Sequence, residues 1–114
     1  MLVIRSEQVE VLELYMVEQF EARMRVHLRR VFAEELEGVS EEELREQIRL
    51  GVERARSYQI MQQSDVQRYL ECMVVYGWKF DTTEWAKVIL HRENWDGEMK
   101  MDEIEQHEFR LAEQ

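Results

Sequence analysis

Apolar residues recur every three or four positions through the first third of the chain, and charged residues occupy most of the positions between them. This spacing places the apolar side chains on one stripe of an α-helix. It predicts a helix of about 30 residues that begins after Ser6. That length exceeds what a compact domain of this size needs, so we expect the helix to end near Phe32 or to project beyond the bundle. The stripe comprises Val9, Leu12, Met16, Phe20, Met24, Leu28, Val31 and Leu36.

A second helix has the clearest start signal in the chain. Ser40 is expected to cap its first turn, and Glu43, three residues later, completes a capping box. Val39 before the cap and Leu44 inside the helix form a hydrophobic staple. Gly51 lies within the apolar pattern of this helix, where it predicts a close crossing with another helix.

Three shorter helices follow, each with the helical spacing of apolar residues. One is expected over residues 64–76, with Ser64 as its cap, and the next over 81–94, with Asp81 as its cap. The last begins near Gly97. No alternating pattern typical of a strand is convincing. The sequence therefore predicts a single all-α domain over residues 1–114, a compact bundle of about five helices with a long N-terminal helix.

Charge limits the classes of partner. The chain of 114 residues has a formal net charge of −10. This charge disfavours DNA, RNA and anionic lipid, because proteins neutralise those surfaces with Lys and Arg. No apolar run approaches the roughly 20 residues that cross a membrane, and the N-terminus lacks a signal-peptide pattern. We expect a cytoplasmic protein that binds neither nucleic acid nor membrane.

Sequence patterns of catalysis are missing from this chain. It has no glycine-rich phosphate loop and no nucleophile elbow. Cys72 is the only cysteine and lies in an apolar run, where burial is expected. Glu103 and His107 are four residues apart, but the sequence places no further metal ligands beside them. We therefore expect a protein that is not an enzyme, with no cofactor and no metal site.

Two groups of residues are candidates for binding a protein partner. Four arginines follow one another without an intervening acid, an exception in so acidic a chain. Two tryptophans lie between or at the ends of predicted helices, and Trp and Arg are enriched at interface hot spots. For the arginines, the alternative is a solvated face that pairs with neighbouring glutamates. The candidates are Arg23, Arg25, Arg29, Arg30, Trp78 and Trp95.

The middle of the chain resembles small helical proteins encoded beside type VI secretion effectors, their spike proteins and their effector chaperones. The similarity is best over residues 44–104, and the first helix resembles the family only in pattern. Gln59 stands where the family usually has glycine, and the prolines that often flank the fourth helix are absent. The matching segments are Ala55–Ile60, Asp65–Tyr69, Met73–Asp81, Trp85–Leu90 and Lys100–Asp102.

These segments also permit a structural interpretation. Asp65 suits the positive end of a helix dipole, and Arg68 is placed to pair with either Asp65 or Asp81. The motif would then maintain the fold rather than bind a partner.

The resemblance implies an accessory function in bacterial type VI secretion. The expected protein is an adaptor or co-chaperone that binds an effector chaperone or an effector during loading. The resemblance supplies no catalytic residues. An immunity protein that neutralises a toxin is the alternative, and an acidic surface would suit a basic toxin. Either function is compatible with a homodimer.

Overall fold

The computed structural model describes the backbone of residues 6–112 and the side chains of residues 16–107. In this part of the chain the regular structure is entirely helical. The elements are α1 (Ser6–Val31), α2 (Glu41–Ser57), α3 (Gln63–Tyr76), the 3-10 helix η1 (Phe80–Thr82), α4 (Glu84–Leu90) and α5 (Gly97–Ala112).

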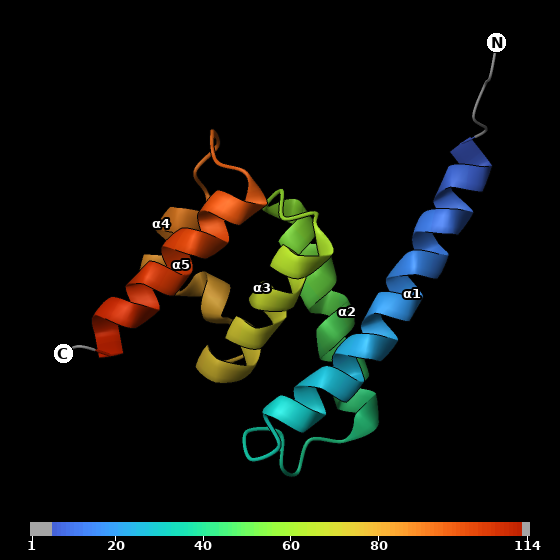
Figure 1. Cartoon of the computed structure of the whole chain (residues 1–114), viewed down its shortest axis with the longest axis horizontal. Coiled ribbons are helices and arrows are strands. Elements are labelled where there is room, and N and C mark those ends of the chain that lie inside the picture. The colour runs from blue at the N-terminus through green and yellow to red at the C-terminus, as the bar shows by residue number, and fades with distance from the viewer. Residues whose placement is uncertain (1–5, 113–114) are drawn as a thin grey trace.

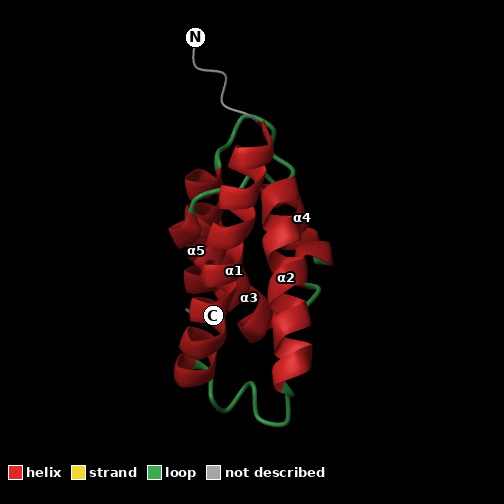
Figure 2. Cartoon of the chain, turned by 90° about the vertical axis from the view of Figure 1, so that its right-hand side faces the viewer, coloured by secondary structure: helices red, strands yellow, loops and turns green. Residues whose placement is uncertain are grey.

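From one side of the molecule to the other, α1, α2 and α3 follow one another, and α4 and α5 overlap beyond α3 (Figure 1). α1 and α2 form a helical hairpin closed by the turns between Val31 and Glu41, and they lie side by side in Figure 2. α3 packs against α1, α2 and α5, while α4 contacts η1 and α5. Within the described residues, α1 therefore touches only α2 and α3. The predicted all-α bundle of about five helices is confirmed.

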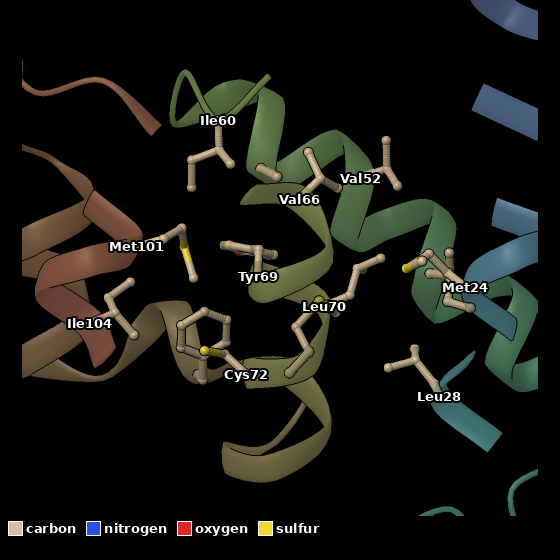
Figure 3. Close-up of a cluster of buried hydrophobic side chains, with 14 of the residues drawn as sticks. Met24, Leu28, Val52, Ile60, Val66, Tyr69, Leu70, Cys72, Met101 and Ile104 are labelled. Atoms are coloured by element: carbon tan, nitrogen blue, oxygen red, sulfur yellow. The ribbon is translucent and has the colours of Figure 1, made fainter. Parts of the chain in front are cut away.

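α3 supplies the centre of the core. Its side chains lie between those of α5 on one side and those of α1 and α2 on the other (Figure 3). Tyr69 is fully buried there, with its ring centroid 5.0 Å from that of Phe80. Cys72 is buried, as expected.

Gly51 marks the crossing of α2 and α3. A Cβ atom added to this glycine would lie 2.5 Å from the Leu70 side chain and 2.6 Å from the Met73 sulfur. Since real Cβ atoms do not approach so closely, any other residue here would require the ends of the Leu70 and Met73 side chains to shift. The close crossing predicted from the sequence is confirmed.

Of the three predicted capping residues, one is right and two are wrong, whereas α5 begins at Gly97 as expected. The Ser40 hydroxyl accepts a hydrogen bond of 3.1 Å from the Glu43 backbone N–H, so α2 has the expected cap. α3 begins at Gln63 with Gln62 before it, which leaves Ser64 inside the helix and not at its cap. Asp81 lies in η1 instead of capping α4, because its carboxylate binds the Tyr58 hydroxyl.

The apolar stripe of α1 is covered unevenly. Phe20, Met24 and Leu28 are buried against the bundle, whereas Met16 and Val31 are each more than half exposed. Val9 and Leu12 lie outside the side chains that the structure describes. α1 ends at Val31, next to the predicted break, and Leu36 is buried beyond it.

Candidate protein-binding surface on α1

The four predicted arginines all belong to the second half of α1, beside the exposed Val26. Helical periodicity places Arg23, Arg29 and Arg30 within one turn of Val26, because residues three and four apart are neighbours on a helix surface. Val26 is 70% exposed, the highest fraction among the large apolar side chains that the structure describes. Shallow hollows surround it. We call this surface the arginine face: Ala22, Arg23, Arg25, Val26, Arg29 and Arg30.

Arg29 has a structural role within the arginine face. Its guanidinium donates hydrogen bonds to the carbonyl oxygens of Leu36 and Val39, at 3.1 and 2.5 Å. It also pairs with the Glu41 carboxylate, with 2.9 Å from Nε to Oε1. These bonds tie α1 to the turn that leads into α2. Arg25 lies 4.0 Å from the same Glu41 carboxylate, which makes a weaker, solvent-exposed pair.

Arg23 and Arg30 are the most accessible cations of the face. Arg23 is exposed and donates a hydrogen bond of 2.8 Å to the side-chain oxygen of Gln63. Arg30 is exposed and, within residues 16–107, has no ion-pair partner. A guanidinium that remains hydrated in the free protein is available to a carboxylate of a partner.

Trp78 and Trp95 lie away from the arginine face. Trp78 is in the turn between α3 and η1, partly buried against the core, and its carbonyl oxygen accepts a 2.9 Å hydrogen bond from Arg54. Trp95 is in the turn between α4 and α5, where the Arg92 guanidinium stacks 4.2 Å from its ring centroid. Over the described residues, α1 contacts none of η1, α4 and α5. The structure therefore separates the two tryptophans from the arginines, and they do not form one site with them.

The motif residues that carry the family resemblance are used inside the fold. Arg68 on α3 binds Asp102 and Glu105 on α5, at 2.7 and 2.8 Å, and binds Asp65 one turn earlier at 3.1 Å. Of its two expected partners, Asp65 is confirmed and Asp81 is replaced by acids of α5. Burial alone would lower the pKa of the Arg68 guanidinium, but hydrogen bonds to Glu105 and Asp102 outweigh that effect and raise it.

Asp81 belongs to a second internal cluster. Its carboxylate accepts a 2.8 Å hydrogen bond from the Tyr58 hydroxyl and lies 3.9 Å from the Arg54 guanidinium. Burial, reinforced by the bond to Asp81, raises the pKa of Tyr58 to about 12. This cluster fastens the end of α2 to η1.

Lys100 on α5 is a third charged residue that is bound within the fold. We call Arg68, Asp81 and Lys100 the internal framework. Its side chain is only 2% exposed, and its ammonium donates a 2.6 Å hydrogen bond to the Tyr58 carbonyl oxygen. That carbonyl is at the C-terminal end of α2, where the helix dipole favours a cation. Burial lowers the pKa of Lys100. Arg68, Asp81 and Lys100 therefore have structural roles, as the structural interpretation of the motif expects, whereas Arg56, Lys79 and Lys87 of the matching segments are exposed.

Sequence reasoning did not single out Val26 or Met61, two of the most exposed apolar side chains. Val26 lies between arginines and off the apolar stripe of the helix, and this position could have indicated from the sequence that its side chain is exposed. Met61 follows α2 in a short connection, where its exposure depends on how α3 packs. No local pattern reports that packing.

The described residues offer few features of other functional classes. None of the described helices combines the length and the apolar content that crossing a membrane requires. Among the described side chains, no three His, Cys, Asp or Glu groups come together in a set suited to a metal ion. Comparison with protein-family models, with curated proteins and with solved structures finds no match for this chain.

Proposed function

We propose that this protein is a non-catalytic adaptor or co-chaperone that binds an effector chaperone or an effector during loading for type VI secretion. The observation that carries the binding function is the arginine face of α1, where Val26 is 70% exposed among four arginines. The secretion context rests on the resemblance of residues 44–104 alone.

An exposed apolar side chain within a ring of cations has the composition of a binding hot spot. Burial of a Val side chain contributes about 1.5 kcal/mol or more, and Arg is enriched at such positions. The internal framework supports this placement indirectly, because Arg68, Asp81 and Lys100 are already engaged with the fold. Arg23, Val26 and Arg30 of the arginine face remain exposed and available to a partner.

The partner surface is expected to be acidic. Although the chain has a net charge of −10, opposite charges act over a short range at physiological salt. The Debye length there is about 8 Å, so the arginines next to a partner matter more than glutamates on distant helices. Association should therefore weaken as salt increases.

The function is tested by deleting the gene and by purifying the tagged protein. An adaptor should co-purify with an effector chaperone or effector, and its loss should lower effector levels and secretion. If deletion leaves secretion unchanged but makes cells sensitive to a toxin from sister cells, the protein is an immunity protein and the adaptor function is wrong. Inhibition of a purified toxin by the chain would lead to the same conclusion.

A further inference from the structure

A second surface adjoins the arginine face at Arg23 and lies where α1 meets α2 and the start of α3. It is an apolar groove whose base is made of buried side chains and whose edges are open. Phe20, Val52 and Val66 form the base, with exposures of only 5%, 7% and 5%. We call it the methionine groove, and it is lined by Met16, Val17, Phe20, Val52, Arg56, Met61, Gln63 and Val66.

Two methionines stand at the open edges of the methionine groove. Met16 on α1 is 53% exposed, and Met61 in the connection from α2 to α3 is 66% exposed. Exposed thioethers of this kind adapt their rotamers to varied apolar surfaces, and methionine is over-used at binding surfaces for that reason. Their location on opposite elements that border the same groove distinguishes them from apolar residues scattered singly over a surface.

The edges of the groove also have two cations. Arg56 on α2 lines the groove and has no ion-pair partner within residues 16–107. Arg23 reaches the same edge from α1, because it donates a hydrogen bond to Gln63, which also lines the groove. The groove therefore combines an apolar base with guanidinium groups beside it.

The apolar base and the neighbouring guanidinium groups favour one kind of binding partner over another. A helix that presents apolar side chains at i, i+3, i+4 and i+7 suits a groove between helices, and carboxylates on its flanks would meet Arg56 and Arg23. A second copy of the chain fits less well. A twofold contact would place the same surface on both sides and bring arginines towards arginines.

We propose that the methionine groove binds an amphipathic helix of a partner protein, with apolar anchors against Met16 and Met61 and carboxylates beside Arg56 and Arg23. This inference deepens the proposed function as a protein-binding accessory and rests on it. It assigns a second contact surface, which shares Arg23 with the arginine face, and states the chemistry of the segment that occupies it.

The test uses two synthetic helical peptides with the same row of leucines, one flanked by glutamates and one by lysines. Fluorescence anisotropy measures the binding of each to the full chain. The acidic peptide should bind at least about tenfold more tightly than the basic one, because charges across the contact change from attraction to repulsion. Equal binding of the two peptides, or no binding of the acidic one, would overturn the proposal.

Matched variants locate the binding. M16Q/M61Q replaces both thioethers with polar side chains of similar length and should weaken the acidic peptide about tenfold or more. R56Q should reduce the preference for the acidic peptide. V88Q and K87Q are the controls, because these exposed residues lie on α4, which in the described part of the chain contacts neither α1 nor α2. Binding that resists M16Q/M61Q, or that V88Q weakens equally, contradicts the assignment.

Two further results separate this inference from the function on which it rests. If a verified partner binds normally to M16Q/M61Q but is lost on mutation of Arg30, the methionine groove is not a contact surface and the adaptor function stands. If the chain self-associates and M16Q/M61Q abolishes that association, the occupant is a second copy and the proposal is wrong.

Discussion

Most charged side chains discussed above on α1 differ in exposure from those between the end of α2 and α5, with Arg29, which binds the turn before α2, and the exposed Arg56 as exceptions. In the second region, Arg68, Asp81 and Lys100 bind groups on other helices and are largely withdrawn from solvent. On α1, Arg23 and Arg30 remain exposed, and the apolar Val26 stands in water between them. Arg68, Asp81 and Lys100 therefore maintain the fold, whereas Arg23, Val26 and Arg30 on α1 remain accessible to a partner.

The largest contrast is expected between the same substitution at two arginines. Arg68→Ala leaves the buried carboxylate of Asp65 without its cation and should lower the free energy of unfolding by about 3 kcal/mol. Arg30→Ala removes an exposed side chain and should change it by less than about 0.5 kcal/mol. Urea unfolding of both variants measures the difference. Equal losses of stability in the two variants would show that Arg68 and Arg30 do not differ in structural role.

The next effect concerns the close crossing of α2 and α3. Gly51→Val introduces atoms where a Cβ alone would lie 2.5 Å from Leu70, so we expect a loss of about 2 kcal/mol. Glu46→Val on the exposed side of the same helix is the control for helix propensity and should cost only about 0.5 kcal/mol. Thermal unfolding distinguishes the two, and an equal cost would show that the crossing tolerates a larger residue.

A smaller effect distinguishes a true cap from an apparent one. Ser40→Ala removes the hydroxyl that accepts from the Glu43 N–H and should cost about 1 kcal/mol. Ser64→Ala should cost less than about 0.5 kcal/mol, because Ser64 lies inside α3 and does not cap it. Both serines begin a capping-box pattern in the sequence, so a matching loss at Ser64 would contradict the observed start of α3.

These outcomes show which features the sequence could predict. Ser40 and Gly51 were predictable, because a cap depends on residues three apart and a glycine within an apolar helix stripe indicates close packing. Asp81 was assigned to the cap of α4 by the same local pattern, but Tyr58, 23 positions away, takes its carboxylate. The partners of Arg68 on α5 lie 34 and 37 positions away. Such pairings, like the methionine groove, depend on how helices converge in space.

The smallest predicted effect concerns a buried acid on α1. Burial raises the pKa of Glu21 above its ordinary value of 4.5, despite the opposing attraction of Arg49 and Arg25. The folded chain then holds this proton more tightly than the unfolded chain, so the contribution of Glu21 to stability falls as pH rises from about 4.5 through the raised pKa.

Glu21→Gln removes that titration. The variant should be slightly more stable than the parent near pH 7, where the parent must bury a charged carboxylate, and the difference should shrink towards about pH 4. Urea unfolding at both pH values measures it. A variant that is less stable near pH 7 would show that Arg49 and Arg25 hold the charged carboxylate favourably, which would make this part of α1 resemble the internal framework.

We expect the arginine face to bind a partner through Arg23, Val26 and Arg30, the exposed side chains that contribute little to folding. The test compares Val26→Glu/Arg30→Glu with Val88→Glu/Lys87→Glu on α4, which makes the same change of charge at a pair of exposed residues. Calorimetry with the verified effector chaperone or effector gives the affinity of each. We predict that the α1 variant loses at least about tenfold in affinity while the α4 variant binds as the parent does, with both melting temperatures nearly unchanged. Equal affinity of the two variants for that partner would contradict the claim.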